Sequence, residues 1–129
     1  MQRKTRKTSK LNQKKIADER IGILFRIADN EALNKNIGQA NRNVELARKI
    51  AMKYNVRIPG EFKRKFCKFC YHYLMPSVTS SVRLNPHEHR VGVKCLTCGK
   101  VMFYPYAREI KKRRRAKSEK RKYKIEKQP

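Results

Sequence analysis

Four cysteines, arranged as two Cys-x-x-Cys pairs, constrain the fold of this chain more than any other feature. Cys67 pairs with Cys70 and Cys95 pairs with Cys98, and 24 residues separate the two pairs. The short spacing lets both sulfurs of a pair point at one centre, and two such pairs supply the four ligands of a tetrahedral zinc ion. The sequence therefore predicts one structural zinc ion bound by all four cysteines.

The start of the chain favours metal binding over disulfide formation. Residues 1–10 are basic and polar and lack the apolar stretch of a secretory signal peptide. No apolar run approaches membrane-spanning length. We therefore expect a cytoplasmic protein, in which thiols stay reduced. Two disulfides or a redox-active pair are the alternatives to zinc, and ligation by one of the three histidines is another.

The region between and beyond the cysteine pairs predicts a zinc ribbon over residues 67–106. Residues 78–84 alternate well enough for a half-buried strand, residues 91–95 form a returning strand, and residues 101–105 form a third. Gly99 permits the positive φ that a metal-binding knuckle needs. The side chains expected to face inward from the first strand are Val78, Val82 and Leu84. The expected unit is a three-stranded antiparallel sheet closed at one end by metal.

A helical hairpin is predicted over residues 16–54. Apolar residues recur at steps of three and four in residues 16–28 and again in residues 39–54, and a polar turn separates these two segments. We expect the helices to pack through Leu24 and Ile27 of the first against Val44 and Ala47 of the second. With the ribbon, this predicts an α+β fold.

The hairpin carries more large apolar residues than a protein of this size can bury, because small domains enclose a low fraction of their surface. Leftover apolar surface on a small chain marks a partner site. We therefore predict a protein–protein interface on the hairpin. Its candidate residues are Ile16, Ile23, Leu24, Ile27, Val44 and Ala47.

The charge of the chain points to a polyanionic partner. The formal net charge is +25 over 129 residues, with 35 Lys and Arg against 10 Asp and Glu. Such a chain repels itself unless a polyanion neutralises it, and nucleic acid is the leading candidate. Residues 1–15 are expected to be a disordered basic arm, residues 55–66 a linker around Pro59-Gly60, and residues 107–129 a flexible basic tail. Solvated tails without a ligand are the alternative for the two ends.

No catalytic pattern is found in the sequence. The His87-Glu88-His89 segment lacks the spacing of a zinc protease, and the segment from Gly92 to Gly99 has the wrong spacing for a phosphate-binding loop. An ion held by four thiolates also keeps no open position for water. We therefore expect no catalytic residues in this chain.

The order of the motifs resembles a known family. ARKIA at residues 47–51, RIP at 57–59, KRKFCKFC at 63–70 and CLTCG at 95–99 together resemble the zinc-ribbon subunit, protein component 4, of archaeal and eukaryotic ribonuclease P. The sequence departs from that family at Ser77, where glycine is expected, and near Phe103-Tyr104, where a basic residue is expected.

The resemblance implies an RNA-binding accessory subunit of an enzyme that removes the 5′ leader of precursor tRNA. Ribonuclease P RNA would carry the catalysis with Mg2+, and the hairpin would bind a second protein subunit with a small Sm-like β-barrel. The residues expected to contact RNA are Lys53, Lys63, Arg64, Lys65, Lys68, Arg83, Arg90, Lys100 and Arg108. Tyr71, Tyr73 and Tyr104 could stack on unpaired bases or serve the ribbon structurally. A ribosomal or transcription zinc ribbon and a thiol oxidoreductase are the rival classes.

Overall fold

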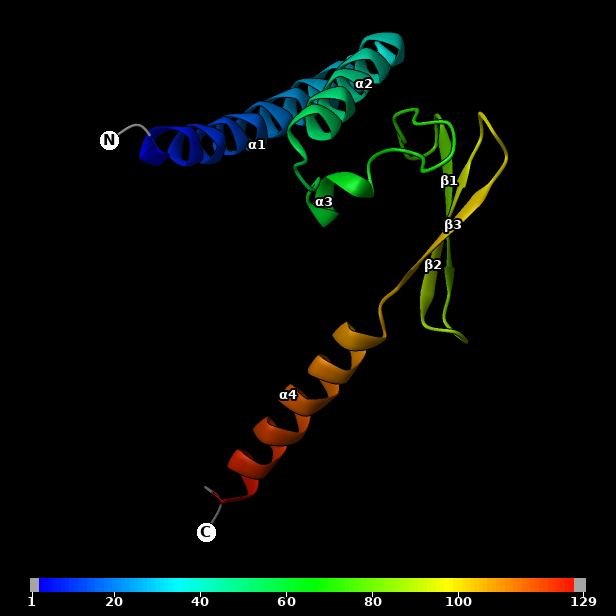
Figure 1. Cartoon of the computed structure of the whole chain (residues 1–129). Coiled ribbons are helices and arrows are strands. Elements are labelled where there is room, and N and C mark those ends of the chain that lie inside the picture. Colours follow the sequence, from blue (N-terminus) through cyan, green and yellow to red (C-terminus); the bar gives the residue numbers. More distant parts are fainter. Residues whose placement is uncertain (1–2, 127–129) are drawn as a thin grey trace.

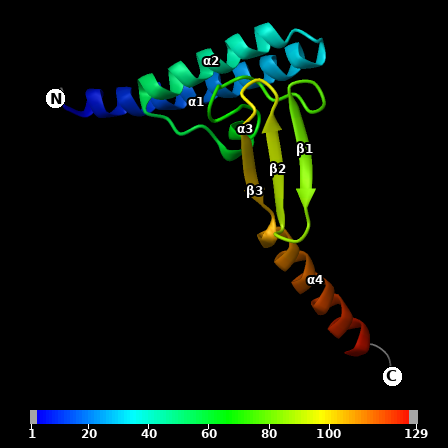
Figure 2. The same cartoon turned by 90° about the vertical axis from the view of Figure 1, so that its right-hand side faces the viewer.

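Two antiparallel helices lie beside a small sheet, and a further helix extends away from it (Figures 1 and 2). The computed structural model describes the backbone of residues 3–126 and the side chains of residues 9–125. The elements, in chain order, are α1 (Arg3–Leu33), α2 (Ile37–Tyr54), α3 (Gly60–Lys63), β1 (Ser80–Asn85), β2 (Arg90–Cys95), β3 (Val101–Pro105) and α4 (Ala107–Glu126). Within the described residues, no helix has both the length and the apolar character that a membrane span requires.

The hairpin core forms where small and large apolar residues of α1 and α2 meet. Ile21 and Phe25 of α1 are fully buried against Val44 and Ala47 of α2. Alanines along both helices let the two backbones approach closely, and they are Ala28, Ala32, Ala40 and Ala51. The hairpin is as predicted, but the predicted contact is wrong in part. Leu24 is only partly buried and Ile27 is 42% exposed, because the buried stripe of α1 is centred on Phe25 instead.

The segment predicted to be a linker belongs to the hairpin core. Phe62 of α3 stacks on Phe25 with ring centroids 4.7 Å apart, and Phe66 stacks on the same ring at 5.9 Å. Val56 and Ile58 also pack against this cluster. Residues 55–66 therefore connect the two parts of the molecule without acting as a spacer.

Asp29 of α1 holds the ribbon against the hairpin. The Tyr73 hydroxyl donates to Asp29 Oδ1 at 2.7 Å, and Lys65 Nζ donates to Asp29 Oδ2 at 2.6 Å. The Tyr73 backbone N–H donates to Asn41 Oδ1 of α2 at 2.7 Å. Burial raises the pKa of Tyr73, and its hydrogen bond to Asp29 and the negative charge there raise it further. Both helices thus contact the ribbon through one tyrosine.

The predicted three-stranded antiparallel sheet is present, with β2 between β1 and β3. A small core of Cys67, Leu74, Cys95 and Met102 lies beneath its metal-binding end. The prediction that Val78, Val82 and Leu84 face inward is correct for the direction of two of them, but all three are exposed rather than buried. Val78 precedes β1, and the register places Val82 and Leu84 on the core face of an edge strand, opposite Val93 and Val91. The core is too short to reach them.

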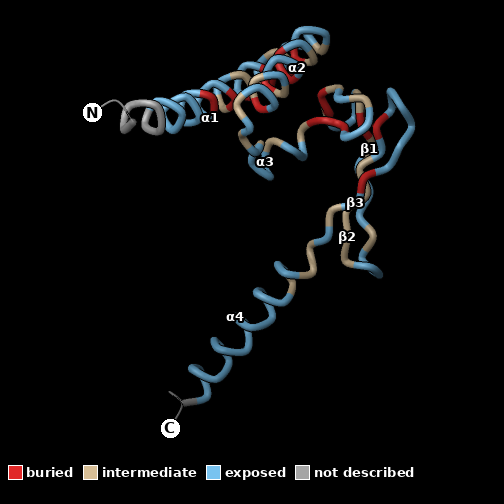
Figure 3. Tube along the Cα trace, in the orientation of Figure 1, coloured by how far each residue is buried: buried red, intermediate tan, exposed pale blue. Residues whose placement is uncertain are grey.

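Both basic ends are helical where the structure describes them, although an arm and a tail without regular structure were expected. α1 begins at Arg3, and α4 covers Ala107–Glu126. Neither residues 3–15 nor residues 107–126 contain glycine or proline, and both are rich in Lys and Arg, which are good helix formers. Figure 3 shows α4 extending from the end of β3, and the helix is exposed from residue 111 to residue 125. Residues 1, 2 and 127–129 lie outside the described residues.

Candidate metal centre and nucleic-acid interface

The four cysteine sulfurs converge at one end of the sheet, and they are positioned to bind one metal ion. All four Sγ atoms lie within 4.8 Å of one another. Cys67 Sγ is 3.6 Å from Cys98 Sγ, and Cys70 Sγ is 3.5 Å from Cys95 Sγ. A tetrahedral ion with metal–sulfur bonds of about 2.3 Å requires sulfurs about 3.8 Å apart. The four thiols are free, and their separations fit a shared ion rather than two disulfides, whose sulfurs lie about 2.05 Å apart.

The two knuckles repeat the same backbone hydrogen bonds. The Cys67 N–H donates to the His72 carbonyl, and the Tyr71 N–H donates to the Cys67 carbonyl. In the second knuckle, the Cys95 N–H donates to the Lys100 carbonyl and the Gly99 N–H donates to the Cys95 carbonyl. The residue after each second cysteine has positive φ, at 61° for Tyr71 and 73° for Gly99. The positive φ predicted for Gly99 is therefore confirmed.

Backbone N–H groups in the knuckles stabilise thiolate sulfur. Burial raises the pKa of Cys95, but hydrogen bonds from the Cys98 and Thr97 backbone outweigh it and bring this pKa to about 7. The Phe69 N–H donates to Cys67 Sγ at 3.4 Å. By contrast, burial raises the pKa of Cys70 to about 12. Metal binding must therefore displace protons from some of the thiols.

Histidine ligation is not part of this cluster in the described residues, because the four converging groups are all cysteines. His87 is exposed in the turn between β1 and β2, and the His89 ring packs edge-on against Tyr106. His72 follows the first knuckle, where its carbonyl accepts from Cys67.

Several predicted RNA-binding residues gather beside the first knuckle. The guanidinium of Arg64 and the ammonium of Lys68 each lie 5.7 Å from the centre of the Tyr104 ring. Lys100 Nζ lies 4.3 Å from the centre of the exposed Phe69 ring. These contacts place three cations around two aromatic rings on one end of the ribbon.

Other predicted RNA-binding residues lie elsewhere or serve different contacts. Lys65 forms the ion pair with Asp29, so its positive charge is neutralised by a residue of the same chain. Arg90 pairs with Glu88 and stacks on Phe103, with its guanidinium carbon 4.1 Å from the ring centre. Lys63 is exposed at the end of α3, directly before Arg64. The remaining members are exposed at scattered positions, and they are Lys53 on α2, Arg83 on β1 and Arg108 on α4.

The hairpin residues predicted to bind a protein partner divide into two groups. Ile16, Ile23 and Ile27 are exposed, and their spacing places them along one stripe of α1. Leu24 is partly buried beside that stripe. Val44 and Ala47 are fully buried between the helices, so the prediction that they contact a partner is wrong. Their small size is needed for close helix packing.

Two sets of contacts were not predicted from the sequence. Arg48 of α2 stacks on Tyr71, with its guanidinium carbon 3.2 Å from the ring centre. Asp29, Asn41 and Tyr73 join the hairpin to the ribbon. One feature of the sequence could have indicated a structural role for Asp29. It is an acidic residue in a strongly basic chain, and it lies beside the buried stripe of a helix.

Comparison with protein families decides what this arrangement of helices and cysteines represents. Residues 20–99 match the family described as "RNAse P Rpr2/Rpp21/SNM1 subunit domain". The chain belongs to this family. The matched residues include most of the hairpin, the segment around α3 and all four cysteines, so the resemblance predicted from the motifs is confirmed.

Individual members of the Rpr2/Rpp21/SNM1 family match nearly the whole chain. "Ribonuclease P protein component 4" of Thermococcus sibiricus is 45% identical over 120 residues, covering 89% of this chain and 96% of that protein. The same-named protein of Pyrococcus furiosus is 45% identical over 114 residues, covering 85% and 94%.

Two solved structures are similar as well. A chain in a "cryo-EM structure of archaeal Ribonuclease P with mature tRNA" has a TM-score of 0.69 and 43% identity, covering 84% of this chain and 91% of that one. A structure titled "Pfu Rpp21 structure and assignments" has a TM-score of 0.52 and 42% identity, covering 68% and 97%.

Proposed function

We infer that this chain is an RNA-binding accessory subunit of ribonuclease P, supporting removal of the 5′ leader from precursor tRNA by the RNA of that enzyme. The observation that carries this inference is the 43% identity over 84% of the chain to a subunit of an archaeal ribonuclease P structure containing mature tRNA. A net charge of +25 supports it, because a ribonucleoprotein provides the polyanion that such a charge requires.

The metal ion proposed for the cysteine site is zinc. Four thiolates in a tetrahedral arrangement are a soft donor set that suits Zn2+, and a closed site of this kind is structural. The ribbon core contains only four buried residues, two of which are cysteines. Zinc would therefore supply most of the stability of the ribbon, on the order of 10–16 kcal/mol of apparent binding free energy in comparable units.

The RNA surface proposed here centres on Arg64 and Lys68 around Tyr104, with Lys63 nearby on α3. These side chains extend from a segment that is fixed by the Phe62 and Phe66 stacking and by the metal site. Fixed cations neutralise phosphates where RNA elements pack together, so fewer divalent ions must be gathered for the RNA to fold. The contribution of this chain is electrostatic and structural.

The proposed protein partner of the hairpin is a second subunit with a small Sm-like β-barrel. Ile16, Ile23 and Ile27 form a stripe of α1 that faces away from the buried stripe at Ile21 and Phe25. A helix with apolar residues on two opposite faces buries only one of them in the hairpin, which leaves the other for a partner.

The proposal is tested by precursor-tRNA cleavage with reconstituted ribonuclease P RNA across a Mg2+ series, with and without this chain and its partner subunit. We expect the protein alone to be inactive and the pair to lower the Mg2+ requirement. An unchanged Mg2+ requirement together with unchanged substrate affinity would refute the proposed function.

The position of the RNA surface is tested by two triple variants of equal charge. Lys63, Arg64 and Lys68 are changed to Glu in one, and Arg113, Arg114 and Arg115 of α4 in the other. We expect the first to weaken RNA binding more, because α4 extends away from the folded body and its charges are less firmly held. The salt dependence of log K should flatten by about 0.7–0.9 for each phosphate that the variant no longer neutralises. Equal losses of RNA binding in the two variants would show that the RNA surface is not centred on the first knuckle.

A further inference from the structure

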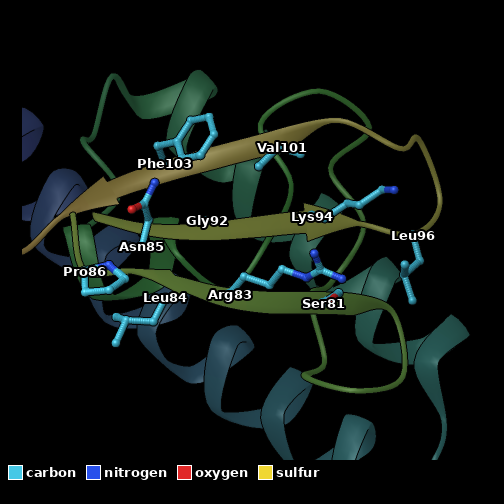
Figure 4. Close-up of a pocket in the computed structure, with 10 residues that line it drawn as sticks. All are labelled: Ser81, Arg83, Leu84, Asn85, Pro86, Gly92, Lys94, Leu96, Val101 and Phe103. Atoms are coloured by element: carbon cyan, nitrogen blue, oxygen red, sulfur yellow. The ribbon is translucent and has the colours of Figure 1, made fainter. Parts of the chain in front are cut away.

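The face of the sheet opposite its small core is open and carries a distinct set of side chains. The register aligns Arg83, Gly92 and Phe103 in one row across the three strands. Lys94 and Val101 lie in the neighbouring row. A groove of about 580 Å³ runs over this face. Figure 4 shows the side chains that line it on the three strands, with the helices behind the sheet.

Gly92 leaves the middle of this face without a side chain. A Cβ atom at this position would lie 3.3 Å from Cε1 of Phe103, which is tighter than most real contacts. The Phe103 ring therefore leans over the bare backbone of β2. In Figure 4, Phe103 lies on one side of Gly92 and Arg83 on the other.

Phe103 is arranged as a stacking surface. The Arg90 guanidinium carbon lies 4.1 Å from its ring centre, and Arg90 is itself held by Glu88. Phe103 nevertheless remains 51% exposed. An aromatic ring fixed by a stacked arginine and still open to solvent has its position set before any ligand arrives.

The charges around the ring are positive. Arg83 and Lys94 are exposed on this face, and among the described residues neither has an acidic partner, since Glu88 pairs with Arg90. The occupant must therefore combine a flat apolar surface with negative charge. A nucleotide has both, and a groove of this volume is ample for a small organic ligand.

We propose that this face binds an unpaired nucleotide of RNA, with its base stacked on Phe103 and its phosphates contacting Arg83 and Lys94. The inference deepens the proposed RNA-binding function and rests on it. It names single-stranded RNA rather than a duplex, because bases inside a helix are already stacked and cannot reach the ring.

The test measures binding of the full-length, zinc-loaded protein to a fluorescent 12-nucleotide single-stranded RNA and to a duplex of the same length. Phe103→Ala should weaken binding of the single strand by roughly 5- to 150-fold, the range that corresponds to removal of one base–aromatic stack. Phe103→Trp should retain the affinity, because it keeps a stacking ring. Leu46→Ala, which also removes an exposed apolar side chain but on α2 and outside this groove, is the matched control and should change nothing.

Binding of the duplex should be the same for Phe103→Ala and the unchanged protein, and zinc content should be equal in all variants. Unaltered single-strand affinity in Phe103→Ala would overturn the proposal. Equal losses for single strand and duplex would also overturn it, as would a loss of protein-partner binding with RNA binding intact. Failure of the accessory function itself looks different, because the unchanged protein would then fail to lower the Mg2+ requirement of ribonuclease P RNA.

Discussion

The two metal-binding knuckles share a backbone conformation but differ in their surroundings. Phe66 and Tyr73, on either side of the first knuckle, belong to the hairpin core, and Tyr71 is covered by Arg48 of α2. The second knuckle connects β2 to β3, and Leu96 and Cys98 are exposed there. One knuckle is thus held by protein and metal together, while the other depends on the metal and its own sheet.

This difference shows that the ribbon and the hairpin are not independent folding units. The same residues complete the hairpin core and position two of the metal ligands, so metal binding is energetically linked to helix packing. The linkage is expected to be strong at the first knuckle and weak at the second.

The largest expected effect is loss of the metal site. Cys67→Ser and Cys98→Ser should each abolish tight zinc binding and unfold the ribbon, because a site of three thiolates forfeits much of the roughly 10–16 kcal/mol that zinc contributes to such units. Much of the helical signal should remain in both. Amide hydrogen exchange in α1 around Phe25 should rise more in Cys67→Ser, which also loosens Phe66 and Tyr73.

Elemental analysis and hydrogen exchange check this prediction, with Thr97→Ser as a control within the second knuckle. Full zinc occupancy in Cys98→Ser would show that this cysteine is not a ligand. Identical exchange around Phe25 in the two cysteine variants would show that the knuckles do not differ as described.

A smaller effect is expected when the hairpin is released from the first knuckle. Asp29→Ala removes the acceptor for the Tyr73 hydroxyl and the partner of Lys65. A buried hydroxyl left without a partner costs about 1–3 kcal/mol. The thermal midpoint should fall while zinc content is unchanged. Asp18→Ala, at an exposed position of the same helix, is the control, and an equal fall in both variants would contradict the role assigned to Asp29.

The same contact predicts a pH dependence at the alkaline end. Burial and the hydrogen bond to Asp29 raise the pKa of Tyr73, so the folded chain holds the phenol proton more tightly than the unfolded chain. The resulting stabilisation is complete below the unfolded pKa of about 10 and is lost as the pH rises above it. The difference in stability between the unchanged protein and Tyr73→Phe should therefore shrink above about pH 10 in denaturant titrations. A constant difference would rule out this contribution.

The local parts of the fold and site could be predicted from the sequence. Two Cys-x-x-Cys pairs impose the knuckle geometry within a few residues, and Gly99 indicates its positive φ directly. The glycine that the family resemblance leads one to expect after Pro76 also has a structural reason, because Ser77 has a φ of 69°. Short-range patterns carry this information since each involves only neighbouring residues.

Contacts between distant residues could not be predicted in the same way. Asp29 and Tyr73 are 44 residues apart, and nothing in either local sequence indicates the other. The exposed side chains of Val82 and Leu84 follow from the limited length of the ribbon core rather than from their alternation. The high positive charge of the two ends led to an expectation of disorder there. The residues have high helix propensity, however, and they form α4 and the first turns of α1.

The smallest expected effect compares the two knuckles at a single equivalent position. Tyr71 and Gly99 both have left-handed φ, which costs a non-glycine residue about 1–2 kcal/mol. Tyr71→Gly should relieve this strain but lose the stack with Arg48, which contributes about 0.5–1 kcal/mol at an exposed site. The two effects nearly cancel, so denaturant unfolding should show little change.

In an Arg48→Ala background, only the relief of strain remains, and Tyr71→Gly should stabilise the protein by about 1 kcal/mol. Arg42→Ala, at an exposed position of α2, supplies the control background. If Tyr71→Gly has the same effect in all three backgrounds, Arg48 does not stabilise the first knuckle.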